Sequence, residues 1–364
     1  MENPQLLDIY TDYLLSSFSL VTATGLSEAL DKQYSHDQIS RFLAKKRFSQ
    51  KDFWLSVKSL VREVESNDGI LIVDDTIEEK PHSTENELIC WHWDHCQQRT
   101  VKGINILNFL YCGQSKNGET VTLPVAFELI AKTEEYVDTK TQTKKKKSAL
   151  TKNELMMERL RTLYFHNQLK FKYLVWDNWF SSKENMDFVH TVLCKKFVSA
   201  IKSNRAVART NEERLKGELT KIEELGLRPN ESMSIWIKGL DFPMLLLKKV
   251  FTNQDGSQKA VFIVTNDIDL TAEEIDKIYQ KRWKIEEFHK SLKQNTGLEK
   301  SPTKYEVTQS NHVFACMIAY CKLELLHIKS KFNHFALKAK LRLQAVKAAF
   351  AEIQRLKTPT LLLR

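Results

Sequence analysis

The sequence has no long apolar run and no paired cysteines, and both absences narrow what the protein can be. No apolar stretch among the 364 residues approaches the roughly 20 residues of a membrane-spanning helix, so we expect no membrane partner. No signal peptide precedes the first cysteine, and no two cysteines form a CxxC pair. We therefore expect a reducing cytoplasm and free thiols at Cys90, Cys96, Cys112, Cys194, Cys316 and Cys321.

The bulk composition is that of a globular protein with a polyanionic partner. Hydrophobic residues make up 42% of the chain and charged residues 28%, which favours a folded protein over a disordered one. The length suggests two or three structural units. The net charge of +9, from 55 Lys and Arg against 46 Asp and Glu, favours binding to a polyanion but does not establish it.

Residues 1–66 have the spacing of apolar residues that is typical of helices. Ser35 and Gln38 form a predicted capping box at the start of one of them. That helix and the residues after it carry a basic group, Arg41, Lys45, Lys46 and Arg47. Two short helices with a basic second member fit a helix-turn-helix that contacts DNA, but equally a helical bundle with a solvated basic face.

Beyond residue 66 the pattern changes to strands that alternate with helices. We expect strands at 69–73, 104–112, 120–129, 173–176 and 197–201, and helices at 153–169, 182–192 and 272–294. Thr271 and Glu274 form a predicted capping box before the last helix, and the lysine-rich stretch 139–152 predicts an exposed loop. This order predicts an α/β fold, a mixed sheet flanked by helical N-terminal and C-terminal regions.

The predicted units follow from these changes of pattern. They are a helical N-terminal region (1–66), a core (67–203 and 267–300), a β-rich insertion (204–266) and a helical, basic C-terminal region (301–364). The insertion has three apolar runs of strand type, and basic residues in and before its loops at Lys202, Arg205, Arg209 and Arg214. Long excursions inside a compact domain are usually functional, so we expect a discrete lobe that grips DNA. The alternative is an extension of the core sheet that only covers the core.

Two buried strands end in carboxylates, at Asp75 and at Asp177. If these strands lie side by side and parallel, the two carboxylates face each other and repel unless a cation lies between them. Hard oxygen ligands of this kind suit Mg²⁺ or Mn²⁺. The alternative is that both aspartates are ordinary turn or capping residues after strands, so a third partner is needed.

That partner lies on the helix at 272–294. Four of its side chains, Tyr279, Arg282, Glu286 and Lys293, share an arc of roughly 60° on an unbroken α-helix. Pairing of Arg282 with Glu286 at a spacing of four residues would explain two of them. An anionic substrate explains all four, because Glu286 would hold metal while the two cations neutralise phosphates and Tyr279 donates to a phosphate oxygen.

These motifs resemble those of a known family. The pattern Tyr-x-x-Arg-x-x-x-Glu-x-x-x-x-x-x-Lys matches, at every fixed position, the Tyr-Arg-Glu-Lys signature of bacterial insertion-sequence transposases of the cut-and-paste DDE type. Val73-Asp74-Asp75-Thr76 looks like the first catalytic motif of that family, in which the aspartate before Thr is the ligand. This assigns the role to Asp75, with Asp74 in reserve, and Val175-Trp176-Asp177 looks like the second motif. The resemblance covers roughly residues 69–300.

The resemblance implies a fold, a reaction and partners. It implies an RNase H-like core with a β-rich insertion, in which Asp75, Asp177 and Glu286 hold two Mg²⁺ (or Mn²⁺) ions for phosphoryl transfer. Tyr279, Arg282, Lys290 and Lys293 would contact DNA. The substrates would be double-stranded DNA with terminal inverted repeats and a target DNA. Two protomers would pair in a synaptic complex, and the protein would be cytoplasmic and associated with the nucleoid.

Weaker features and rival functions remain beside this interpretation. Residues 90–96 hold four possible soft-metal ligands, but their spacing fits no usual zinc pattern. Trp236 is either a core residue or a platform for a flipped base, and Asn266 is either functional or a turn residue. The rival functions are a catalytically inactive DNA-binding derivative and an RNase H-like nuclease without strand transfer.

Overall fold

The computed structural model describes residues 3–94, 97–139, 142–252 and 255–357. The chain divides into two compact units. Unit 1 comprises Met1–Val57, Glu78–Gly103 and Phe288–Arg364, and unit 2 comprises Lys58–Ile77 and Ile104–Glu287. None of the helices in the described ranges combines the length and hydrophobicity that a bilayer span requires.

Unit 1 is built mainly from helices of the two ends of the chain. These are α1 (Pro4–Ser16), α2 (Ala23–Ala29), α3 (His36–Ala44), the start of α4 (Gln50–Val64), most of α9 (Trp283–Asn295), the short η4 (Leu298–Lys300), α10 (Glu306–Ser330) and α11 (His334–Leu356). They are joined by β2 (Cys90–Asp94), which pairs antiparallel with the first residues of β3 (Arg99–Gln114). The predicted capping box of α3 is confirmed, since Gln38 N donates to Ser35 Oγ and Ser35 N donates to Gln38 Oε1.

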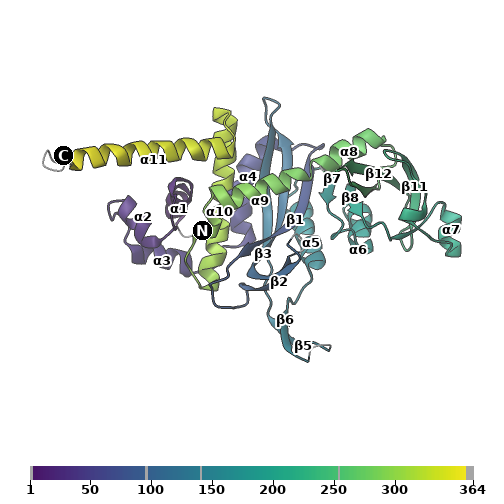
Figure 1. Cartoon of the computed structure of the whole chain (residues 1–364), viewed down its shortest axis with the longest axis horizontal. Helices are drawn as coiled ribbons and strands as arrows, with labels where there is room; N and C mark the ends of the chain where they lie inside the picture. Colours follow the sequence, from purple (N-terminus) through teal and green to yellow (C-terminus); the bar gives the residue numbers. More distant parts are fainter. Residues whose placement is uncertain (1–2, 95–96, 140–141, 253–254, 358–364) are drawn as a thin grey trace. The chain divides into compact units, whose positions relative to one another are not determined.

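Helix α10 is the centre of unit 1 (Figure 1). The ring of Phe314 packs against Phe48 and Phe53, with centroids 4.9 and 5.6 Å away. The Asn311 amide donates to the carbonyls of Leu43 and Lys46 and accepts from Phe48 N, so one buried side chain satisfies the backbone where α3 ends. The region that the sequence assigns to helices is therefore held together by a helix from the other end of the chain.

Unit 2 contains a large mixed sheet. Its strands follow the order β10-β9-β11-β12-β13-β8-β7-β1-β3, and β4 pairs with β3. Their bounds are β1 (Ile70–Glu79), β4 (Thr120–Leu129), β7 (Tyr173–Trp176), β8 (Lys196–Ile201), β9 (Ala206–Ala208), β10 (Thr220–Lys221), β11 (Ser232–Ile237), β12 (Met244–Thr252) and β13 (Gln258–Thr265). Strands β1, β7 and β8 are parallel, and the pairs that flank them at β3–β4 and from β8 to β11 are antiparallel. The predicted α/β class with a mixed sheet is confirmed.

The helices of unit 2 lie on both faces of this sheet. They are α5 (Lys152–Arg161), α6 (Lys183–Asp187), α7 (Asn211–Lys216), the short η3 (Ile222–Glu224) and α8 (Ala272–Gln280). Figure 1 shows α6 and α8 on opposite sides of β7 and β8. The helices predicted at 153–169 and 182–192 are confirmed, but each ends in a π-helical turn, η1 (Thr162–His166) and η2 (Phe188–Val192). Periodicity does not distinguish these turns from α-helix.

Two predicted segments differ from the structure, the lysine-rich loop and the insertion. Within the lysine-rich stretch, predicted as a loop, β6 (Lys144–Lys147) pairs with β5 (Glu134–Val137). Lys145 lies 2.7 Å from Asp138 and Lys147 lies 3.4 Å from Glu134, so opposite charges offset the repulsion within the lysine run. The three apolar runs of the insertion do form strands, but their sheet continues the core sheet, because β13 pairs with β8 from Phe262↔Ile201 to Thr265↔Val198.

Asn266 fastens this continuation to the core. The residue is 4% exposed, and its Oδ1 accepts from Phe197 N at 2.8 Å while its Nδ2 donates to the Lys195 carbonyl at 3.0 Å. Nδ2 also lies 2.9 Å from His190 Nδ1. The side chain that the sequence left as a possible turn residue thus satisfies backbone groups where β8 begins.

We predict that Asn266→Ala lowers the free energy of unfolding by about 1–3 kcal/mol, because it leaves buried backbone groups without partners. The matched control is Asn117→Ala in an exposed turn of the same unit, which should change it by less than about 0.5 kcal/mol. Chemical denaturation measures both. Equal effects of the two substitutions would show that Asn266 does not fasten the sheet.

Candidate active site

The two predicted aspartate motifs lie on adjacent parallel strands. Strand β7 is fully buried and pairs with β1 in the register Ile72↔Val175. If this register is continued by two residues, Asp74 is level with Asp177. The loop after β7 fixes Asp177 further, since Trp179 N donates to Asp177 Oδ1 at 2.9 Å. Strand β1 runs on to Glu79, so Asp74 and Asp75 lie within the strand and not at its end as predicted.

Asp74 and Asp177 repel each other in a poorly solvated position. Burial raises the pKa of Asp74 well above its ordinary value, and the charges of Asp177, Asp75 and Glu286 raise it further. Burial likewise raises the pKa of Asp177, with a smaller increase from Asp75, while the Trp179 amide and Arg282 act against the increase. The arrangement therefore concentrates negative charge that a bound cation would stabilise.

Asp75 has different partners from Asp74. Its Oδ2 accepts from Lys152 Nζ at 2.7 Å and from Asn105 Nδ2 at 2.8 Å. Lys152 is the first residue of α5, whose start is fixed by a capping box between Thr151 and Glu154. Lys152 and Asn105 thus hold the Asp75 carboxylate from a helix and from the neighbouring strand β3.

The predicted long helix is interrupted at the middle of the signature. Helix α8 ends at Gln280 and α9 begins at Trp283, so the single helix expected at 272–294 is wrong. The cause is a tight turn, in which Lys281 N donates to Ile278 O and Arg282 N donates to Tyr279 O, each three residues back. The roughly 60° arc assumed an unbroken helix, and Tyr279 now belongs to one helix and Glu286 to the next.

Arg282 nevertheless joins the signature to the aspartates. Its Nη1 lies 3.1 Å from Glu286 Oε1 and 3.9 Å from Asp74 Oδ2. The guanidinium carbon lies 5.9 Å from the centroid of the Tyr279 ring. Burial raises the pKa of Tyr279, and the charges of Asp177 and Asp74 add to this against the opposing effect of Arg282. Among the described residues, the buried Arg282 Nε has no hydrogen-bond partner, so it retains a donor for a ligand.

Lys290 and Lys293 follow on α9, within unit 1. Lys290 Nζ lies 5.2 Å from the ring centroid of Phe335. Lys293 is close enough to Glu78 to lower the pKa of that carboxyl, although burial has the larger effect and raises it. The structure therefore gives both lysines neighbours within their own unit.

The site is a cluster of carboxylates with cations between them. Asp74, Asp75, Asp177 and Glu286 interact electrostatically, and Asp74 is the β1 aspartate on which Glu286 acts. In the described part of the chain, no three His, Cys, Asp or Glu side chains are placed to hold one metal ion. Carboxylate oxygens that repel one another are nevertheless the donor set that suits a divalent cation. The residues fit Mg²⁺ or Mn²⁺ in chemistry, with Lys152 and Arg282 now close to those oxygens.

Sequence reasoning missed Lys152, Asn105 and Trp179. Lys152 was predicted to end a loop, although Thr151 and Glu154 beside it form a signal for the start of a helix. Asn105 is a polar residue inside an apolar strand, and a side chain of that kind needs a buried partner. Trp179 lies two residues beyond Asp177, and its ring centroid is 5.4 Å from Lys152 Nζ.

Two weaker sequence features are only partly placed. His95 and Cys96, half of the possible zinc ligands, lie outside the described residues. Cys90 Sγ is 3.2 Å from His92 Nε2, and both residues are buried. Trp236 is partly exposed, and the guanidinium of Arg214 lies 5.4 Å from its ring centroid.

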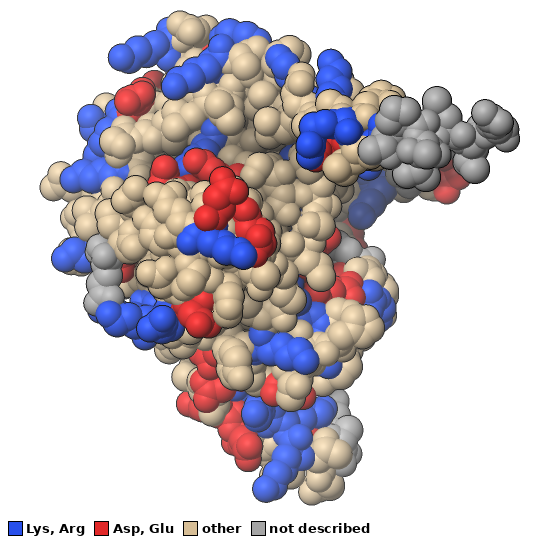
Figure 2. Space-filling view, turned by 90° about the vertical axis from the view of Figure 1, so that its left-hand side faces the viewer, with Lys and Arg blue, Asp and Glu red and all other residues tan. Residues whose placement is uncertain are grey.

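Among the residues that the structure describes, basic and acidic side chains are mixed on the face in Figure 2. Lys and Arg are interspersed there with Asp and Glu, and a group of acidic side chains lies near the middle of the view. For the residues drawn in colour on this face, the excess of positive charge is therefore interrupted by acidic side chains.

Comparisons with known proteins bear on the whole chain. No curated protein is detectably similar to it. Among solved structures, it matches the Drosophila P element transposase strand transfer complex at 10% identity, over 98% of this chain and 87% of that chain. The TM-score of 0.29 is too low for this likeness to bear on fold or function.

Two family models match more specifically. The model described as "Transposase DDE domain" matches residues 137–322, and the model described as "DDE superfamily endonuclease" matches residues 3–221. Each match spans more than half of the 364 residues. The protein therefore belongs to the family of DDE transposases and endonucleases.

Proposed function

We propose that this protein is a DNA transposase of the bacterial Tyr-Arg-Glu-Lys group, which cleaves transposon ends and transfers the strands to target DNA. The observation that carries the proposal is the position of Arg282. Its guanidinium lies beside both Asp74 and Glu286, and its buried Nε keeps an unused donor. A cation at the border of a carboxylate cluster is what a metal-dependent phosphodiester reaction needs to hold a phosphate next to its ions.

The proposed metal ligands are Asp75, Asp177 and Glu286, for two Mg²⁺ (or Mn²⁺) ions. When bound, the ions would activate the attacking water or 3′-hydroxyl and stabilise the leaving oxygen. The assignment of Asp75 follows the Val-Asp-Asp-Thr motif. It is supported by the contact that this carboxylate makes with a cation, since the Lys152 ammonium lies 2.7 Å from Asp75 Oδ2. Asp74 is the alternative first ligand, because Glu286 acts on it directly.

Side chains outside the proposed metal ligands would bind and orient DNA. Arg282 and Tyr279 would hold the phosphate next to the carboxylates, and Lys290 and Lys293 would contact phosphates further along α9. The N-terminal helices, with the basic group after Ser35, would contribute to recognition of the terminal inverted repeats. Two protomers would pair two ends in the cytoplasm, in association with the nucleoid.

The first prediction from this proposed function separates metal binding from phosphate binding. We expect Glu286→Gln to keep its affinity for end DNA and to abolish cleavage, because it removes one ligand and leaves the cations in place. Glu287→Gln is the matched control, since Glu287 is exposed on the same helix and pairs with Lys284 at 2.8 Å. It should cleave normally. Cleavage of DNA carrying the inverted repeats that flank the gene is measured with Mg²⁺. Loss of activity in both variants, or in neither, would remove Glu286 from the mechanism.

The second prediction concerns Arg282. Arg282→Ala should weaken end binding by about 10-fold or more, because charge-assisted hydrogen bonds are among the strong ones. The slope of log affinity against log salt should become shallower by about 1 for a lost phosphate contact. Gel-shift titrations at several salt concentrations measure both quantities. Full affinity with an unchanged slope would contradict the phosphate role.

The third prediction uses the raised pKa of Asp74. Because folding raises the pKa of the Asp74 carboxyl, its ionised form is less favourable in the folded state than its protonated form. The free energy of unfolding therefore falls as the pH rises through the folded pKa. Asp74→Asn cannot ionise. In chelator it should therefore exceed the unmodified protein in free energy of unfolding at about pH 7, and the gain should vanish below the unfolded pKa of about 3.9.

Asp75→Asn is the contrasting variant for this measurement. It removes the charge that Lys152 and Asn105 hold, so it should lower the free energy of unfolding in the same buffer. On the motif assignment Asp75→Asn also abolishes cleavage, while Asp74→Asn retains part of it. The reverse pattern of activities would transfer the ligand role to Asp74, and a destabilised Asp74→Asn would contradict the electrostatic account.

A further inference from the structure

The start of α5 is joined by hydrogen bonds to both aspartate motifs of unit 2. Its first residue, Lys152, donates to Asp75 Oδ2 at 2.7 Å. Its second residue, Asn153, accepts from the side-chain amide of Asn185 at 2.9 Å. The same amide donates to the Phe180 carbonyl, at 2.8 Å, in the loop that follows β7. One turn of helix therefore contacts β1 directly and, through one side chain, the loop after β7.

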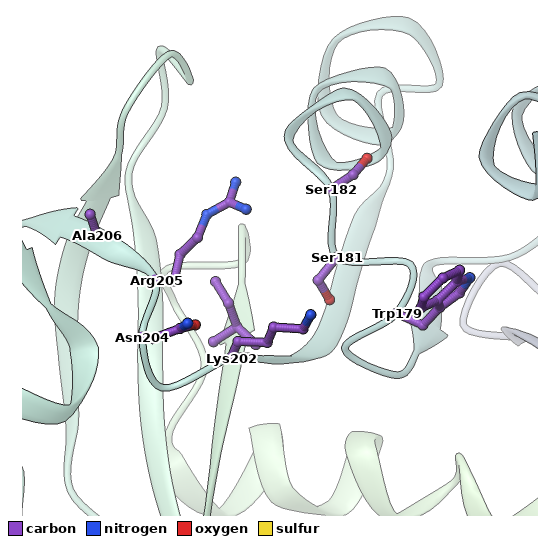
Figure 3. Close-up of a pocket in the computed structure, with 8 residues that line it drawn as sticks. Trp179, Ser181, Ser182, Lys202, Asn204, Arg205 and Ala206 are labelled. Atoms are coloured by element: carbon purple, nitrogen blue, oxygen red, sulfur yellow. The ribbon is translucent and has the colours of Figure 1, made fainter. Parts of the chain in front are cut away.

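The loop between β7 and α6 is fixed by its own hydrogen bonds. Trp179 N donates to Asp177 Oδ1 at 2.9 Å, and Ser181 Oγ donates to the Asp177 carbonyl at 3.1 Å. Ser182 is the N-cap of α6, and its Oγ accepts from Asn185 N at 3.1 Å. Figure 3 shows this loop at the edge of a pocket, leading from Trp179 through Ser181 to Ser182. The position of Asp177 is therefore tied to that of Asn185, and through it to α5.

Helix α5 is held near both of its ends, so Lys152 extends from a defined place. At the start, Thr151 and Glu154 form the capping box. Near the end, Arg159 Nε donates to Glu128 Oε1 on β4 at 2.6 Å. Lys152 and Arg159 are separated by about two helical turns, so both contacts leave the same face of the helix. That face is directed toward the sheet that carries the aspartates.

The two donors that hold Asp75 reach the same oxygen. Lys152 Nζ and Asn105 Nδ2 both contact Oδ2, the latter at 2.8 Å. Asn105 is only 1% exposed and belongs to β3, so packing sets the position of its amide. Among the residues that the structure describes, none donates to the other oxygen, Oδ1. The carboxylate is therefore held by one oxygen and has the second available to a ligand.

A cation beside a metal ligand can act in two opposite ways. If Lys152 only neutralises the cluster, its removal leaves more negative charge for an ion, and metal binding becomes stronger. If it orients Asp75, its removal makes metal binding weaker, because hydrogen bonds to ligating groups typically contribute about 10–100-fold to metal affinity. Asn105 favours the second role, since an uncharged amide holds the same oxygen and neutralises nothing.

We propose that Lys152 is a positioning residue for the metal ligands of the reaction. With Asn105, it orients Asp75 through one oxygen. Through Asn153, the same turn of helix fixes the loop after β7 and so sets the separation of the two aspartate motifs. The inference rests on the proposed function for the role of Asp75 as a ligand, and it adds a residue whose action is on metal affinity.

Mn²⁺ binding to the full-length protein without DNA is the main test, with the free ion measured by electron paramagnetic resonance. Binding that Asp177→Asn abolishes is assigned to the carboxylate cluster. Lys152→Met should weaken this binding by about 10-fold or more, and Asn105→Ala should weaken it as well. The matched control is Lys170→Met, since Lys170 is an exposed lysine of the same unit, and it should leave the affinity unchanged.

A milder variant and two further measurements separate positioning from loss of folding. Asn153→Ala keeps Lys152 and the bond from Asn185 to Phe180, so it should weaken Mn²⁺ binding less than Lys152→Met does. Chemical denaturation in chelator shows whether each variant folds. Gel shifts in chelator measure the affinity for end DNA, which should be the same for Lys152→Met as for the unmodified protein. A loss of DNA affinity without a loss of Mn²⁺ affinity would make Lys152 a phosphate contact and overturn the proposal.

The remaining outcomes separate this proposal from the proposed function. Stronger Mn²⁺ binding by Lys152→Met would show a neutralising role, and unchanged binding would show no role, so either would overturn the inference. Cleavage of end DNA by the unmodified protein is measured in parallel. Absent cleavage, with Mn²⁺ binding weakened in Lys152→Met, would remove the transposase function and leave the positioning role. Absent Mn²⁺ binding by the unmodified protein would remove both.

Discussion

Repulsion between carboxylates on adjacent parallel strands is the constraint on which the site depends. Continued by two residues, the register of β1 and β7 places Asp74 level with Asp177, and Asp75 and Glu286 add to the negative charge around them. Such a cluster is unstable unless positive charge lies nearby. The chain supplies it from two further elements, with Lys152 from the start of α5 and Arg282 from the turn between α8 and α9. The carboxylates of β1 therefore depend for their counter-charges on the start of α5 and on the turn between α8 and α9.

Much of the fold could be predicted from local patterns. The buried strand β7 has the predicted bounds Tyr173–Trp176, and the capping boxes at Ser35 and Thr271 form as expected. These features depend on residues close together in the sequence. The pairing of β13 with β8 was not predictable in the same way, because an apolar run specifies a strand but not its neighbour. The turn at Lys281 and Arg282 was missed because the apolar periodicity continues through it.

The candidate site was likewise predictable only where the residues belong to one local motif. The motifs identified Asp177, Glu286, Arg282 and Tyr279, and these residues interact in the structure either directly or through Asp74. Which of two consecutive aspartates faces which partner is a matter of side-chain direction, and adjacent residues of a strand point to opposite faces. Asn105 and Lys152 come from a strand and a helix far from the motifs in sequence. Only the assembled sheet could show that both meet at Asp75.

Lys152 gives this arrangement a consequence for how the protein folds. Domains that depend on a structural ion, such as zinc fingers, stay unfolded until the ion arrives, because their ligands have no other way to be satisfied. Here the Lys152 ammonium lies 2.7 Å from Asp75, and Arg282 lies 3.1 Å from Glu286, so the polypeptide carries its own counter-charges. Two of the clustered carboxylates therefore have counter-charges from the polypeptide itself, and in this respect the site differs from domains whose fold depends on a structural ion.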